Sequence, residues 1–187
     1  MDQTNLYKNK YKIKSSRRPD WDYGTEASYF ITICTQNHSC YFGDIVNGQM
    51  ALSEMGLIVH DEWLKTPMIR PDMHILLDAF VIMPDHFHAI ITIGHNTTDI
   101  RDAMHRVSNI VPDNRCNKFG PQSKNLASVI RGFKSAVTTR IKKQIPECMF
   151  CWQRLYHERR ISDELHIHLI RQYIIDNPTK WELSRGI

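Results

Sequence analysis

The sequence predicts a mixed α/β (α+β) domain, with helices packed on one face of a central, mainly antiparallel sheet. Short runs of β-branched and aromatic residues, separated by turn residues, predict the strands. Two long segments in the second half repeat apolar residues at helical spacing. The resulting order of strand, hairpin, helix, strands, helix and helix is typical of this fold class. The chain length fits one domain, 1–187, with a basic N-terminal arm at about 1–24 and a mobile loop at about 95–124.

The first elements after the arm are a strand, a hairpin and a helix. Residues 28–35 (SYFITICT) have the aromatic and β-branched composition of a strand. Residues 41–52 predict a hairpin, because the Asn-Gly dipeptide at 47–48 is a strong turn signal. Ser53 is predicted to cap a helix that ends near Lys65. Its apolar residues Leu57, Ile58 and Trp63 lie on or near one face.

The later elements are a second β-rich block and two helices. The β-rich block covers 74–77, 79–83 and 86–93. An amphipathic helix is predicted over 126–143. The last helix is predicted over 162–177, with Ser162 as its N-cap and Pro178 just past its end.

The composition argues against a membrane-spanning protein and against a secreted, disulfide-rich one. No apolar run approaches the roughly 20 residues that span a bilayer. The N-terminal segment is polar and basic, without the apolar centre of a signal peptide. The five cysteines fit reduced thiols better than a disulfide framework. Cys148 and Cys151 have the spacing of half a zinc site, but the other cysteines do not complete it. We expect a soluble, cytoplasmic protein.

Basic residues are concentrated in two segments, although the formal net charge is only +4. One is the N-terminal arm, and the other lies between Asp113 and Glu147, where there is no acidic residue. A short basic run is usually a solvated surface, but two separate runs favour nucleic acid as a partner. The candidate DNA-binding residues are Arg17, Arg18, Arg131, Lys134, Arg140, Lys142 and Lys143.

The most specific chemical signal is the segment Pro-Asp-His-Phe-His at 84–88. On a strand, His86 and His88 point to the same side, about 7 Å apart along the chain, so both imidazoles can reach one divalent ion. Phe87 would then face the buried side. Two histidines alone are an incomplete metal site, and a pair of partly buried core histidines is the competing interpretation.

The last predicted helix offers a phenol and an amide on one face. Tyr173 and Asn177 are four residues apart, so their side chains are neighbours on the helix surface. Asn177 could give an oxygen ligand to an ion, with Tyr173 one turn earlier. From this helix alone, a core tyrosine and a helix-terminal asparagine remain the favoured interpretation.

Four motifs in order along the chain resemble one known family. They are DYG at 22–24 with YFITICTQN at 29–37, VIMPDHFHAIITI at 81–93, IRGFKSAVT at 130–138, and WQR at 152–154 followed by Tyr173, Asn177 and Pro178. Together they resemble the REP-associated tyrosine transposases, a branch of the single-tyrosine HUH endonucleases. The resemblance covers nearly the whole chain.

The resemblance implies a compact HUH domain with a ferredoxin-like or RRM-like sheet. It also implies His86, His88 and Asn177 as ligands of a divalent ion, Mg²⁺ or Mn²⁺, and Tyr173 as the nucleophile. The implied partner is single-stranded DNA with hairpin-forming palindromic repeats. The enzyme would nick and rejoin this DNA through a 5′-phosphotyrosine. It would act as a monomer or homodimer and would not contact a membrane.

The chain departs from the family pattern after its WQR motif. Where the family usually has a histidine this chain has Arg159, and where the family usually has an arginine it has Ser162. Any DNA contact or orienting role of those two positions is therefore in doubt here. Tyr156 is a competing nucleophile, but no ligand residue lies four positions after it. Two other functions stay open: a metal-dependent hydrolase that uses water, and a non-catalytic, domesticated nucleic-acid-binding protein.

Overall fold

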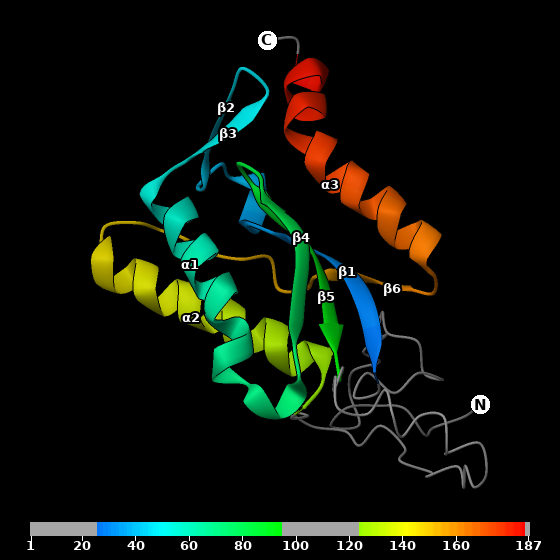
Figure 1. Cartoon of the computed structure of the whole chain (residues 1–187). Helices are drawn as coiled ribbons and strands as arrows, with labels where there is room; N and C mark the ends of the chain where they lie inside the picture. Colours follow the sequence, from blue (N-terminus) through cyan, green and yellow to red (C-terminus); the bar gives the residue numbers. More distant parts are fainter. Residues whose placement is uncertain (1–25, 95–123, 186–187) are drawn as a thin grey trace, which may run out of the picture.

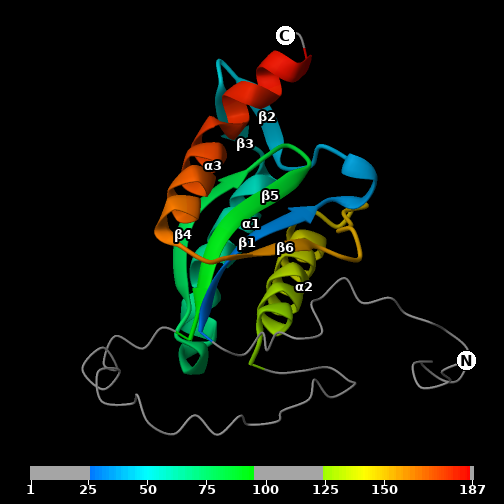
Figure 2. The same ribbon diagram turned by 90° about the vertical axis from the view of Figure 1, so that its right-hand side faces the viewer.

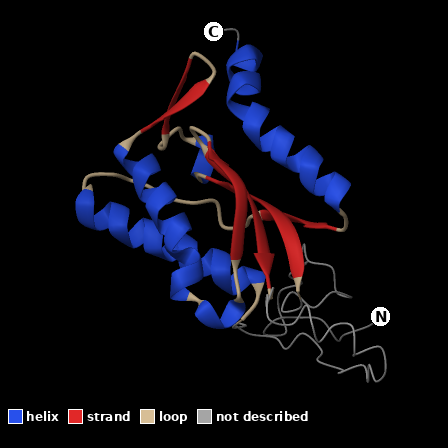
Figure 3. Ribbon diagram, viewed as in Figure 1, coloured by secondary structure: helices blue, strands red, loops and turns tan. Residues whose placement is uncertain are grey.

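A four-stranded antiparallel sheet forms the centre of the structure, a computed structural model that describes residues 26–94 and 124–185. Its strands are β1 (Ala27–Cys34), β4 (Leu76–Ile82), β5 (His86–Ile93) and β6 (His157–Ile161), in the order β4-β5-β1-β6. The predicted arm lies outside the described residues, as does the predicted loop apart from Lys124. The mixed α/β class with an antiparallel sheet is confirmed (Figure 3).

Helices cover both faces of this sheet, so the prediction of helices on one face is wrong. Helices α1 (Glu54–Ile69) and α2 (Leu126–Gln144) lie on one face, and α3 (Glu164–Arg185) lies on the other (Figures 1 and 2). The alternation of β5 explains this arrangement: Phe87, Ala89 and Ile91 are fully buried toward α1 and α2. Ile90 belongs to a separate small core with Ile174 of α3.

The larger core lies between the sheet and the pair α1 and α2. Three aromatic rings meet at its centre, from Trp63 of α1, Phe87 of β5 and Phe133 of α2, with centroids 4.9 to 5.6 Å apart. Each such ring contributes about 2–3 kcal/mol through burial. This core therefore holds the face of β5 that points toward α1 and α2, and the histidines lie on the opposite face of the strand.

The helix after the hairpin begins as predicted and ends later. The Ser53 hydroxyl accepts a hydrogen bond from the Gly56 amide at 3.1 Å, which confirms it as the N-cap of α1. The helix continues through Pro67 to Ile69, four residues past the predicted end. Thr66, which is buried and donates to the Glu62 carbonyl, holds this last turn. Leu57, predicted near the apolar face, is half-exposed.

Helix α3 differs from its prediction at both ends. Its N-cap is Asp163 and not Ser162, because the Asp163 carboxylate accepts the His166 amide at 2.9 Å. The helix then passes through Pro178 and ends at Arg185, so the predicted end before the proline is wrong. Contacts beyond the proline hold this extension: Trp181 packs near His86, and Thr179 lies beside Gly48.

The hairpin is confirmed, and the later strands differ in number from the prediction. Strands β2 (Gly43–Val46) and β3 (Gln49–Leu52) pair around Asn47 and Gly48, both with positive φ. The predicted blocks 74–77 and 79–83 are replaced by one strand, β4, which covers only 76–82 and has an irregular register after Leu77. Strand β6 was not predicted. None of the described helices is long and apolar enough to cross a bilayer.

An ion pair between Asp78 and Arg171 ties α3 to β4, with guanidinium–carboxylate distances of 2.6 to 3.1 Å. The hydrogen bonds from Arg171 lower the pKa of Asp78. We expect Asp78→Asn to lower the free energy of unfolding by about 0.5–1 kcal/mol, because the pair is partly exposed. The difference from wild type should be fully present above Asp78's ordinary pKa and should be lost as pH falls from there through the lowered pKa of the folded state.

Urea titrations at several pH values would measure this effect. Asp176→Asn is the matched control, since Asp176 pairs with Lys180 on the surface of the same helix. An effect of Asp78→Asn no larger than that of the control, at neutral pH, would show that the pair does not anchor α3.

Candidate active site

His86 and His88 lie side by side on the face of β5 that α3 covers. Their ring centroids are 4.6 Å apart. His88 is buried, and the side chain of His86 is 14% exposed. The sequence predicted this shared face correctly, because the alternation of β5 separates the histidines from the core residues between and after them.

A hydrogen bond at Nδ1 orients each imidazole. His86 donates through Nδ1 to the Asp85 carboxylate at 2.5 Å, and Nδ1 of His88 is 2.8 Å from the Thr32 hydroxyl of β1. The Nε2 atoms are therefore the ones left to bind a ligand. Burial, and then the nearby charge of His86, lower the pKa of His88 to about 3. His88 is neutral near neutral pH, which is the form that binds metal ions.

Tyr173 of α3 lies directly over His88. Its phenolic oxygen is 3.4 Å from Nε2 of His88, and the two ring centroids are 5.4 Å apart. Phe30 of β1 stacks on His88 and meets the Tyr173 ring edge-on. Tyr173 remains 41% exposed, so a residue that contacts the buried histidine can also be reached from outside.

Asn177 lies one turn after Tyr173 on the same face of α3 and is buried. Trp181, one further turn along, packs near His86 with ring centroids 5.5 Å apart. The amide is thus flanked by two residues that contact the histidine pair. In the described ranges, no three His, Cys, Asp or Glu side chains form a group that could hold a metal ion. Asparagine is not one of these four residue types, so the Asn177 amide oxygen stays a candidate for the third ligand.

Asp85 and His38 form a chain of hydrogen bonds behind His86 that was not predicted from the sequence. The buried Asp85 carboxylate accepts from His86 through one oxygen and contacts Nδ1 of His38, at 2.9 Å, through the other. Burial raises the pKa of Asp85, but the bonds to the two histidines hold it below its ordinary value. The Thr35 hydroxyl donates to the Asp85 carbonyl and fixes the turn. The only sequence signal was an aspartate directly before the first histidine.

Comparison with known proteins identifies a relative and a fold. No family model matches the chain. An uncharacterized protein of Haemophilus influenzae is 38% identical over 172 residues, which cover 90% of this chain and 89% of the relative. The chain belongs to the same family as this Haemophilus protein.

Two solved structures resemble this one at low sequence identity. A REP-associated tyrosine transposase, solved bound to a REP hairpin, superposes with a TM-score of 0.56 at 17% identity, over 89% of this chain and 74% of its own. A Deinococcus radiodurans protein described as a candidate transposase matches at a TM-score of 0.44 and 16% identity, over 87% of this chain and 95% of its own. The first likeness confirms the predicted fold class.

The basic residues predicted to bind DNA do not gather at the histidine pair. Arg17 and Arg18 lie outside the described residues. The others are on α2, which lies on the opposite face of the sheet from α3 (Figure 2). The histidine pair faces α3, so these residues lie across the sheet from it. Lys134 donates to the Gln153 carbonyl, and Arg140 pairs with Asp61 and Glu62 of α1. The exposed members are Arg131, Lys142 and Lys143.

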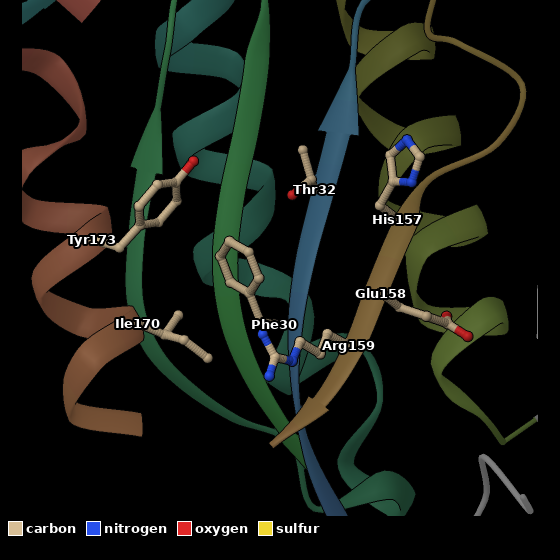
Figure 4. A pocket seen from close by; sticks show the side chains of 7 residues that line it. All are labelled: Phe30, Thr32, His157, Glu158, Arg159, Ile170 and Tyr173. Carbon is tan, nitrogen blue, oxygen red and sulfur yellow. The ribbon is translucent and has the colours of Figure 1, made fainter. Parts of the chain in front are cut away.

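A hollow of about 350 Å³ opens between α3 and β6, next to Tyr173 (Figure 4). It is lined by Phe30, Thr32, His157, Glu158, Arg159, Ile170 and Tyr173. The proposed nucleophile thus forms one wall of a cavity on the same face of the sheet as the histidines. This cavity could not be foreseen from the sequence, because β6 was not predicted.

Proposed function

We propose that this protein is a transposase-like endonuclease, which nicks single-stranded DNA beside hairpin-forming repeats and rejoins it through Tyr173. The contact between the phenolic oxygen of Tyr173 and Nε2 of His88, at 3.4 Å, is the observation that carries the proposal. This contact places the Tyr173 phenol, the proposed nucleophile, beside the neutral imidazole of His88, which lies next to His86. The shared fold with a REP-associated tyrosine transposase supports the same activity.

The residues present fit a divalent ion. Asp85 and Thr32 occupy the Nδ1 atoms of His86 and His88, so the Nε2 atoms would bind the ion, with the Tyr173 phenol moving from its contact with Nε2 of His88 to the phosphate. Asn177 would supply an oxygen. A mixed nitrogen and oxygen set suits Mn²⁺, with Mg²⁺ as the abundant alternative. When bound, such an ion would polarise the scissile phosphate and stabilise the charge of the transition state.

Tyr173 would attack the phosphorus in line with the departing 3′ oxygen. The bond from phosphorus to the 3′ oxygen breaks, a phosphotyrosine forms on the 5′ side, and the 3′ oxygen takes up a proton. The phenol gives its own proton to solvent water as it attacks, and water likewise supplies the proton that the 3′ oxygen takes up. The Lys180 ammonium lies 6.0 Å from the centre of the Tyr173 ring, so a positive charge stands beside the attacking residue. Attack by a second 3′-hydroxyl on the phosphotyrosine releases Tyr173 and joins the strands without an external energy source.

The direct test uses purified protein, Mn²⁺ and labelled single strands from repeats in the source genome. We expect a protein–DNA adduct that survives denaturation and a free 3′-hydroxyl end. Cleavage without an adduct would instead support a hydrolase that uses water. Binding of the repeat strands without cleavage would support the non-catalytic, domesticated alternative.

Asp85→Asn should weaken Mn²⁺ binding by about 10–100-fold, because an amide holds the His86 ring less firmly than a carboxylate does. Calorimetric titration with Mn²⁺ measures this directly and does not depend on turnover. Asp44→Asn, on the exposed side of the β2 strand, is the control with the same chemical change. Equal affinities for Asp85→Asn and wild type would show that Asp85 does not orient His86 for metal.

Replacing Lys142 and Lys143 together should weaken DNA binding and lower its salt dependence by about one unit of slope for each lost phosphate contact. These two side chains are exposed, so their loss does not disturb the fold. Binding isotherms at several salt concentrations give the slope. Lys134 and Arg140 are poorer test sites, because each one holds a structural contact. An unchanged slope would remove this end of α2 from the DNA-binding surface.

A further inference from the structure

The hollow between α3 and β6, here called the β6 pocket, has a mainly apolar wall next to the proposed nucleophile. Phe30 of β1 and Ile170 of α3 project into it, and Tyr173 bounds it (Figure 4). Phe30 is placed firmly, because it stacks on His88 with ring centroids 5.3 Å apart. An aromatic ring beside an aliphatic side chain is a surface on which a planar base can stack.

The opposite wall of the β6 pocket carries two exposed nitrogen-bearing side chains. His157 and Arg159 lie across from Thr32 and Phe30 in the pairing of β6 with β1, so they face the α3 side of the sheet. Within the described ranges, Arg159 makes no hydrogen bond or ion pair. Figure 4 shows the Arg159 guanidinium extending toward Phe30, while the Glu158 carboxylate points away from Tyr173.

We propose that the β6 pocket binds one unpaired nucleotide of the substrate strand, with its base against Phe30 and Ile170 and its phosphate at Arg159. This inference rests on the proposed function for the identity of the ligand, because it assigns the pocket to the strand that Tyr173 attacks. A volume of about 350 Å³ lies at the small end of ligand pockets and suits one nucleotide. A guanidinium can hold a phosphate through two parallel hydrogen bonds.

The base must be unpaired to enter. Stacking against Phe30 and Ile170 requires a free face, and a base inside a duplex has both faces covered by its neighbours. The pocket would therefore help to select single strands next to the attacked phosphate.

Methyl NMR of the metal-free protein in EDTA tests the inference without any cleavage. The probes are the tetranucleotides dA4, dC4 and dT4, and the reporter is the δ-methyl group of Ile170. A stacked base should shift this signal in a saturable way by its ring current. Ile175, exposed on the same helix and outside the pocket, is the control and should stay unchanged. Inorganic phosphate, which has no ring, should not reproduce the shift, and neither should a blunt duplex.

Arg159→Ala should weaken tetranucleotide binding about tenfold, the loss expected for one charge-assisted phosphate contact. Arg154→Ala is the matched control, since Arg154 is exposed and lies outside the pocket. Equal losses in the two variants, or an Ile170 signal that no tetranucleotide moves, would overturn the inference. Adduct formation by a protein whose Ile170 signal stays unmoved would refute the pocket alone. A shifted signal in a protein that never cleaves would refute the proposed activity and leave the pocket standing.

Discussion

Tyr173→Phe is expected to abolish nicking and adduct formation, with a loss of roughly a thousandfold or more, while single-stranded DNA still binds. The change removes one oxygen and keeps the ring, so the edge-on contact with Phe30 and the packing of α3 should survive. The lost contact is the one between the phenol and Nε2 of His88. The measurement is the rate of adduct formation with a labelled repeat strand, together with a binding isotherm for the same strand.

Mass spectrometry of the wild-type adduct gives a second, independent result. We expect the nucleotide on Tyr173. Tyr156 is the competing residue, but it is partly buried against the larger core, on the far side of the sheet from the histidine pair. An adduct on Tyr156 would keep the class of enzyme and overturn the choice of nucleophile. Normal cleavage by Tyr173→Phe would favour water as the nucleophile.

The histidine strand could be predicted because its two faces differ so strongly in sequence. Phe87, Ala89 and Ile91 are apolar and alternate with the histidines, which fixes both the strand and the direction of the imidazoles. The sequence did not show what covers the polar face. That depends on α3, whose attachment rests on a small core and on the pair between Asp78 and Arg171, residues far apart in the chain.

Strand β6 escaped prediction because it lacks the signals of a strand. Its sequence, HERRI, is charged, and only Ile161 is buried. It lies at the edge of the sheet, where pairing with β1 decides the conformation and one face needs no apolar residues. The bond from His38 to Asp85 was also out of reach, since it joins a short turn to a strand 47 residues later.

His88→Ala should lower Mn²⁺ affinity by at least about a hundredfold and stop cleavage, because removing a ligand costs more than removing the residue that orients it. His86→Ala should act in the same way. DNA binding should be largely kept, because phosphate contacts supply most of the affinity. Calorimetry with Mn²⁺, the adduct assay and a binding isotherm separate the three quantities.

The control for both variants is His168→Ala, on an exposed site of the same helix as Tyr173. It should bind Mn²⁺ and cleave as wild type does. His88 is buried and bonded to Thr32, so its replacement leaves a small void, and circular dichroism must show that the variant still folds. His86 is less buried and serves as the second test where His88→Ala is unstable. If a folded His86→Ala protein binds Mn²⁺ as tightly as wild type, the histidine pair is not the metal site. If it cleaves DNA at the wild-type rate, a metal ion held by the pair is not needed for cleavage.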